Sequence, residues 1–147
     1  MYRNVLLVVH LAALAGWLGG NFTQFFMAPW FAHRGGVEAV AWYEATGRMA
    51  RRYYNVAGTL LALSGVLLLL HSDGVYRWSS GFVGVGLAVV VVGGLTGVVF
   101  FAPDSDRMAA DARSGRPARV RRFLLVLCVD SALVLTAVLA MVAKWRV

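Results

Sequence analysis

Charge is scarce in this sequence of 147 residues. Asp, Glu, Lys and Arg make up 14% of it, whereas an average soluble domain has about 25%. The chain has one cysteine, Cys128, so it cannot form an internal disulfide and does not belong to the disulfide-rich secreted domains. It also lacks the phosphate-binding glycine–lysine loop, the zinc-protease histidine pair and the nucleophile elbow. No soluble-enzyme motif therefore indicates a reaction.

Apolar residues take the place of the missing charge. They make up 60% of the sequence, and a domain of this size has no interior large enough to hide them from water. A bilayer core of about 30 Å is crossed by about 20 apolar helical residues, and four runs reach that length: 5–31, 53–71, 81–102 and 123–143. Backbone in lipid must satisfy its own hydrogen bonds, which favours helices. We therefore expect an all-α fold, a four-transmembrane-helix bundle that forms one domain over residues 1–147.

The basic residues lie between these runs, and their distribution predicts an orientation. The connections 32–52 and 103–122 hold 10 arginines, whereas the two tails and the connection 72–80 hold 4 Lys and Arg. The positive-inside rule places the richer side in the cytoplasm and both termini outside. We expect an integral protein of a bacterial inner membrane, in which the net charge of +7 reflects orientation and not a nucleic-acid partner. We also expect residues 36–52 to be partly helical and residues 103–122 to form a solvated loop facing lipid headgroups.

One face of the first apolar run carries polar side chains. At about 100° per residue, four of them fall within about 40° of one line on a helix: His10, Trp17, Asn21 and Gln24. Polar groups at membrane depth usually face protein or a cavity, because lipid leaves them without hydrogen-bond partners. The stripe is either a seam in which each group is paired to a neighbouring helix, or the wall of a cofactor pocket.

Residues near the outer ends of three runs form a candidate cofactor site. His10 lies about 9 Å below the outer end of the first run, and His71 ends the second. Met141 and Lys144 share one face of the fourth run. Imidazole and thioether groups are axial ligands of haem iron, and helix bundles commonly hold such cofactors between facing helices.

We therefore expect haem b or a related redox cofactor at this end. His10 would be one axial ligand, with His71 or Met141 opposite. Trp17 would pack beside the cofactor. Copper held by His10 and His71 is the alternative, since copper takes the same ligand types.

A second polar group lies nearer the inner end. Asp130 is the one carboxylate inside a predicted span, and it lies at about the depth of Asn21 and Gln24. An ionisable residue at this depth is a candidate proton site. The alternative is a hydrogen-bonded aspartate that fixes the fourth helix against the first. Three soft or borderline ligands of copper lie on the same side, at a spacing that is not diagnostic: Met27, His33 and Cys128.

Two pairs of glycines have the spacing that lets helix backbones approach closely: Gly16 with Gly20, and Gly93 with Gly97. This spacing predicts either a tightly packed bundle or association with another chain. The partners it suggests, besides the bilayer, are a second copy of the chain or a larger membrane complex.

The segment VHLAALAGWLGG at residues 9–20 resembles the opening helix of the CopD/HemJ-like membrane proteins. That group includes copper-resistance membrane proteins, HemJ-type protoporphyrinogen oxidases and several uncharacterised four-helix families. The tail AMVAK at residues 140–144 is similar to the closing helix of one uncharacterised branch. The resemblance implies a four-helix bundle and, for the HemJ branch, a b-type haem near the histidine that matches His10.

These observations favour a haem-binding membrane protein that serves electron transfer or tetrapyrrole oxidation. Two alternatives belong to other classes. One is a cofactor-free accessory or scaffold subunit that packs through its glycine faces. The other is a small transporter, either proton-coupled through Asp130 or specific for copper. Whether the chain is an enzyme stays open at this point.

Overall fold

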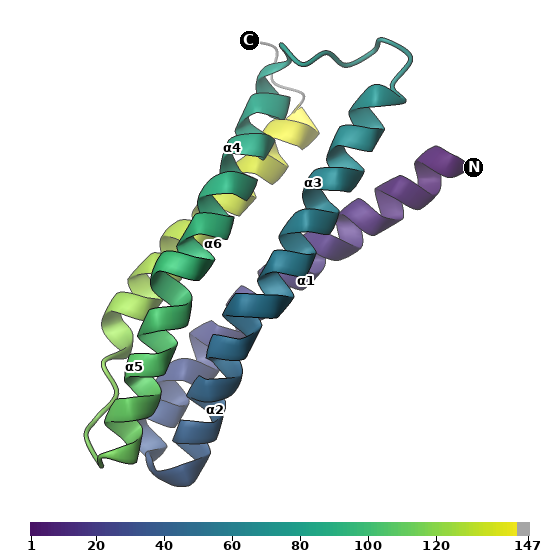
Figure 1. Ribbon diagram of the computed structural model, residues 1–147. Helices are drawn as coiled ribbons and strands as arrows, with labels where there is room; N and C mark the ends of the chain where they lie inside the picture. The colour runs from purple at the N-terminus through teal and green to yellow at the C-terminus, as the bar shows by residue number, and fades with distance from the viewer. Residues whose placement is uncertain (144–147) are drawn as a thin grey trace.

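A computed structural model describes residues 1–143 and is all-α. Four of its continuous helices are long and apolar enough to cross a membrane: Tyr2–Arg34, Gly36–Leu70, Gly81–Arg113 and Val120–Ala143. Figure 1 shows them side by side as an elongated bundle. The predicted four-helix membrane bundle is confirmed at this level.

Two of the long helices contain a short π-helical segment. The second consists of α2 (Gly36–Arg48), η1 (Met49–Tyr53) and α3 (Tyr54–Leu70). The third consists of α4 (Gly81–Thr96), η2 (Gly97–Phe101) and α5 (Ala102–Arg113). The first and fourth are the single helices α1 (Tyr2–Arg34) and α6 (Val120–Ala143).

The helices extend further than the apolar runs predicted. Residues 36–52 are fully helical and continue into α3, and the expected loop 103–122 is helical up to Arg113. The prediction of a loop there was wrong because an apolar run measures the hydrocarbon thickness and not the length of a helix. In α5 the buried Met108 and Ala109 pack in one cluster with Tyr43 of α2.

Ion pairs hold the same helices together on their exposed side. Arg51 makes two hydrogen bonds to the Asp106 carboxylate, of 2.9 and 3.0 Å. Arg113 pairs with Glu44 across α2 and α5. Core packing and ion pairs thus stabilise helical structure beyond the apolar runs.

The bundle has two chemically different ends. Figure 1 places the start of α1, the connection between α3 and α4 and the end of α6 at one end, called here the 71–80 end. The opposite end is called the arginine-rich end and carries ten arginines: Arg34, Arg48, Arg51, Arg52, Arg107, Arg113, Arg116, Arg119, Arg121 and Arg122. In a bundle of four antiparallel helices the connections alternate between the two ends, as they do here.

The buried core is concentrated in the middle and at the arginine-rich end. Tyr43 is completely buried there, and its hydroxyl donates a 2.9 Å hydrogen bond to the backbone carbonyl of Ala28. Phe101 and Phe123 pack edge to face in the same cluster. A second cluster surrounds Trp17 near mid-bundle. In Figure 1 the first half of α1 diverges from the other helices, and this is the part of the bundle in which the candidate site lies.

Candidate functional site

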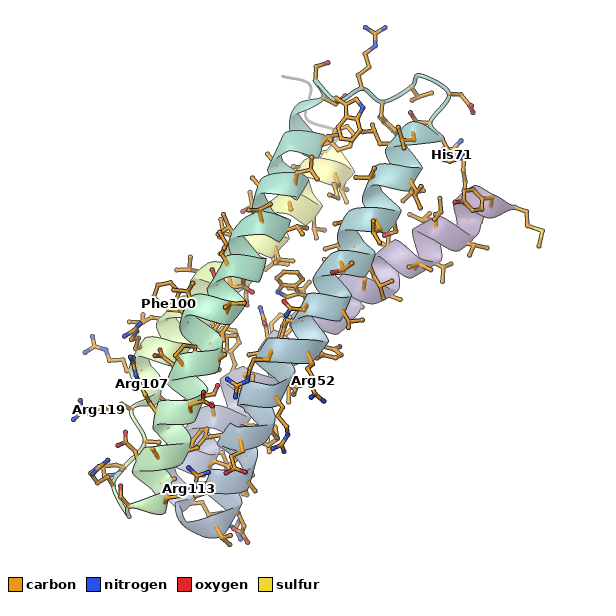
Figure 2. The ribbon with its side chains drawn as sticks, viewed as in Figure 1. Arg52, His71, Phe100, Arg107, Arg113 and Arg119 are labelled. Carbon is orange, nitrogen blue, oxygen red and sulfur yellow. The ribbon has the colours of Figure 1, made fainter. Side chains whose placement is uncertain are left out.

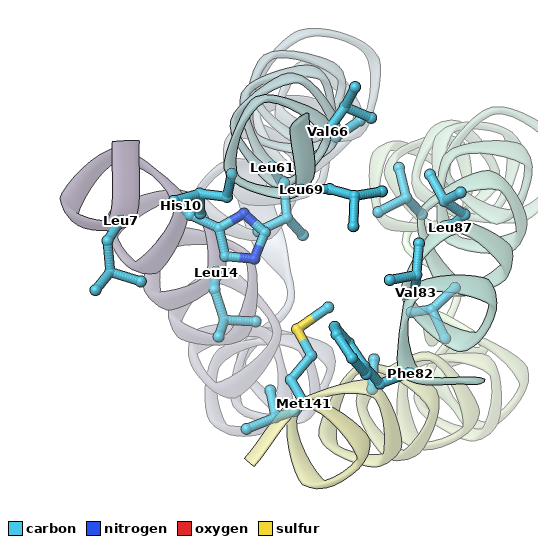
Figure 3. Close-up of a pocket in the computed structure, with 18 of the residues that line it drawn as sticks. Leu7, His10, Leu14, Leu61, Val66, Leu69, Phe82, Val83, Leu87 and Met141 are labelled. Carbon is cyan, nitrogen blue, oxygen red and sulfur yellow. The ribbon is translucent and has the colours of Figure 1, made fainter. Parts of the chain in front are cut away.

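A cavity of about 710 Å³ lies between the four long helices at the 71–80 end. Its walls are mostly aliphatic, and side chains reach it from α1, α3, α4 and α6 (Figure 3), among them Leu14, Leu61, Leu87 and Val134. The volume is within the range of about 300–1,000 Å³ that small-molecule and cofactor sites have. A few polar side chains among apolar walls are typical of such sites.

His10 is the polar group that enters the cavity from α1. It is buried, and its Nδ1 lies 3.0 Å from Oγ of Ser64 on α3. Ser64 donates its only proton to the backbone carbonyl of Leu60, at 2.5 Å. A hydroxyl has a single proton, and with that proton on Leu60 we assign His10 Nδ1 as the donor to Ser64. The neutral imidazole therefore carries its lone pair on Nε2, and Figure 3 shows the second ring nitrogen turned toward the cavity.

Gly65 makes room for this imidazole. A methyl group at that position would lie 3.1 Å from Cε1 of His10, which is tighter than an ordinary van der Waals contact. The absence of a side chain therefore lets the ring lie against the backbone of α3. Together, Ser64 and Gly65 fix the orientation of His10.

Met141 enters the cavity from α6. Figure 3 shows its thioether projecting into the cavity next to Phe82. Its methyl group lies against α4 at Gly86, where an added methyl group would be 2.7 Å from Met141 Cε. The structure thus brings His10 and Met141, two of the predicted ligands, to one cavity.

Trp17 forms the floor of the cavity and is 2% exposed. Its indole lies between α3 and α4 at two glycines. An added methyl group would be 3.1 Å from Trp17 Cζ3 at Gly58 and 2.4 Å from Cζ2 at Gly93. Tyr54 packs against the same ring edge to face, with the ring centroids 6.0 Å apart.

Below the floor, Asp130 of α6 accepts two hydrogen bonds from α1. Trp17 Nε1 donates to its Oδ2 at 3.0 Å, and Asn21 Nδ2 donates to the same oxygen at 2.8 Å. Asn21 also donates to Ser131 at 3.0 Å, and its carbonyl oxygen accepts a 3.0 Å bond from Tyr54. Asp130 thus lies in a buried hydrogen-bond network that connects α1, α3 and α6.

Other predicted site residues lie elsewhere. His71 is exposed, its Nδ1 is hydrogen-bonded to the Leu67 carbonyl, and its ring packs against Tyr2. Figure 2 shows it on the outer side of α3, and it does not line the cavity. Gln24 is buried beside Thr46 instead of Asp130, with its Nε2 unpaired among the described residues. Lys144 lies outside the described residues.

The soft ligands at the other end do not gather into a site. His33 is exposed and bonded to the Pro29 carbonyl, and Cys128 is exposed on α6. Met27 is half-buried on α1. Among residues 1–143, no group of three or more His, Cys, Asp or Glu side chains is placed to hold a metal ion.

The predicted glycine faces accommodate side chains of the same chain. An added methyl group at Gly16 would lie 2.7 Å from the Tyr53 hydroxyl oxygen, and one at Gly20 would lie 2.6 Å from that of Tyr54. Gly93 accommodates Trp17 in the same way. Close packing within the bundle therefore accounts for these three glycines.

Sequence reasoning missed the two residues that orient His10. Ser64 had a usable signal, because it is the one polar side chain in a run of leucine, alanine, glycine and valine from 60 to 70. Gly65 had none, since glycine is common in membrane helices. Comparison of the chain with protein-family models, with curated proteins and with solved structures finds no match in any of the three. What the cavity binds is therefore inferred from its residues.

Proposed function

We propose that this membrane protein binds haem b or a related redox cofactor in the cavity at the 71–80 end, for electron transfer or tetrapyrrole oxidation. The observation that carries this proposal is the orientation of His10. Its Nδ1 proton is directed to Ser64, so the Nε2 lone pair is available to a metal ion in the cavity. Histidines that bind metals usually donate their other ring N–H to a fixed acceptor in this way.

The rest of the cavity fits a haem. Its volume and aliphatic walls suit a flat apolar macrocycle. Met141 projects its thioether into the same cavity as His10, which makes it a better second ligand than His71, which does not line the cavity. Histidine–methionine ligation raises the reduction potential of haem iron, and when bound the haem would supply one-electron chemistry.

We predict that the protein purified after haem-supplemented expression has a Soret band that depends on His10. His10→Ala is expected to lose most of the bound haem, because the cavity offers no other imidazole in the described residues. Met141→Leu is expected to keep haem but to change its ligand-field spectrum, since the apolar shape is retained and the sulfur is lost. Pyridine haemochrome quantification and absorption spectra measure both effects.

His71→Ala is the matched control, because it removes a histidine at the same end that does not line the cavity. It should leave haem content and spectrum as in the wild type. A wild-type protein without Soret absorbance, or full haem occupancy in His10→Ala, would contradict the proposal. If metal analysis of the purified protein finds copper in place of iron, His10 and Met141 would hold it, in place of the predicted pair His10 and His71, because His71 does not line the cavity.

We further propose that the arginine-rich end faces the cytoplasm, so that the cavity lies in the outer half of the membrane. Ten arginines at that end support this orientation. In a Cys128→Ser background, Val75→Cys lies at the 71–80 end and Ser114→Cys at the arginine-rich end, and both positions are exposed.

A membrane-impermeant maleimide is expected to label Val75→Cys in intact cells and Ser114→Cys only after lysis. The reverse pattern would overturn the orientation without affecting the cavity.

A further inference from the structure

Arg3, His10 and Trp17 lie on one line of α1. They follow one another at intervals of seven residues, which returns a side chain to nearly the same face of a helix. Seven residues rise by roughly 10 Å along the axis. All three side chains line the cavity. Arg3 is therefore at its rim, His10 in its middle and Trp17 at its floor.

Arg3 is the only Asp, Glu, Lys or Arg among the described residues that line the cavity. Within residues 1–143 it has no ion pair and no side-chain hydrogen bond. Tyr76 and Trp78, from the connection between α3 and α4, also line the cavity, and their ring O–H and N–H groups are further donors without a partner in the described residues. The rim thus presents donors and positive charge above an apolar interior.

We infer that Arg3 binds a carboxylate of the cavity's ligand and so sets which end of the ligand faces out. This inference rests on the proposed function and extends it to the orientation of the cofactor. The two propionates of haem b would lie at the rim beside Arg3, Tyr76 and Trp78. The apolar edge of the macrocycle would point toward Trp17.

The reason is the cost of burying charge. A carboxylate placed among aliphatic side chains loses its hydration with no partner to replace it. At the rim the same group gains a charge-assisted hydrogen bond from a guanidinium, which matches a carboxylate with two parallel N–H groups. The roughly 10 Å between Arg3 and His10 along α1 is comparable to the reach from a porphyrin centre to the end of its propionates.

Protoporphyrin without iron and its dimethyl ester separate this inference from iron ligation. Both have the same macrocycle, but only the free acid has carboxylates. Their affinities are measured by porphyrin fluorescence with the purified wild-type protein, Arg3→Gln and Arg77→Gln. Arg77 is a matched control because it is an exposed arginine at the same end that does not line the cavity.

We expect Arg3→Gln to weaken binding of the free acid by about tenfold or more, the size of one hydrogen bond to a charged group. Binding of the dimethyl ester should be unchanged in Arg3→Gln, and Arg77→Gln should bind both porphyrins like the wild type. Equal affinities of wild type and Arg3→Gln for the free acid would overturn the inference. So would an equal loss for both porphyrins, because that result indicates a structural role of Arg3.

The outcome is independent of the test of His10. A carboxylate preference that requires Arg3, together with normal haem occupancy in His10→Ala, would support carboxylate binding by Arg3 and contradict His10 as a ligand of the haem iron. Loss of haem in His10→Ala with no effect of Arg3→Gln would support His10 as a ligand and contradict carboxylate binding by Arg3.

Discussion

Gly93→Ala is expected to destabilise the bundle by about 2 kcal/mol or more, as for overpacked cores. The new methyl group would lie 2.4 Å from Cζ2 and 2.8 Å from Cη2 of Trp17, and 3.2 Å from Oδ1 of Asp130. The indole cannot move away, because Gly58 of α3 confines its other side and Asp130 holds its N–H. The gain in helix propensity from glycine to alanine is only about 1 kcal/mol. Thermal unfolding in detergent, followed by tryptophan fluorescence, measures the loss.

Gly94→Ala is the control for this prediction. It makes the same chemical change one residue further along α4, where nothing lies within 4 Å of the added methyl group. Its stability should equal or slightly exceed that of the wild type. If the two variants unfold at the same temperature, the indole is not confined between α3 and α4 as described.

Asp130→Ala is expected to cost about 2–3 kcal/mol, because it leaves the buried donors of Trp17 and Asn21 without their shared acceptor. Hydrogen bonds between membrane helices average less than this, about 0.6 kcal/mol. Two hydrogen bonds to one carboxyl oxygen, with Trp17 2% and Asp130 3% exposed, justify the larger figure, because both buried donors would be left unpaired. The free energy of unfolding in a mild detergent with increasing denaturing detergent measures it.

Ser131→Ala is the neighbouring control, since it removes only one of the two acceptors of Asn21 Nδ2. It should cost less than about 1 kcal/mol. Asp130→Asn retains one acceptor oxygen and should fall between the two alanine variants. An Asp130→Ala protein within 0.5 kcal/mol of wild type, a margin typical of surface substitutions, would show that the network contributes little to the bundle.

The four spans could be predicted from the sequence because hydrophobic length is a local property. The helix ends could not, because they depend on contacts between segments. Residues 103–113 look like a polar loop by composition. They are helical because Met108 and Ala109 are buried beside α2 and because Asp106 and Arg113 pair with Arg51 and Glu44.

The candidate site, too, could be predicted from the sequence only in part. The sequence placed His10, His71 and Met141 in one layer, and in the structure His10 and Met141 line the same cavity. His10 lies beside Ser64 and Gly65, six to seven residues before His71 on α3. Depth along a helix does not say in which direction a side chain points. His71 at the end of α3 is directed outward and bonds to Leu67, whereas Ser64 and Gly65 direct His10 inward. Asp130 was expected near Asn21 and Gln24, but only Asn21 reaches it, while Gln24 lies against Thr46.

The contacts of Trp17 have a consequence for how the chain is assembled during synthesis. In the folded chain the indole lies against Gly58 and Gly93 of the second and third long helices, but its N–H is bonded to Asp130 of the fourth, 113 residues downstream. Until the fourth span is inserted, a nascent chain holds an unsatisfied donor between its first three helices, and such a group is costly in hydrocarbon. We therefore expect a chain truncated before Asp130 to be released poorly into the bilayer and to be degraded readily by membrane proteases.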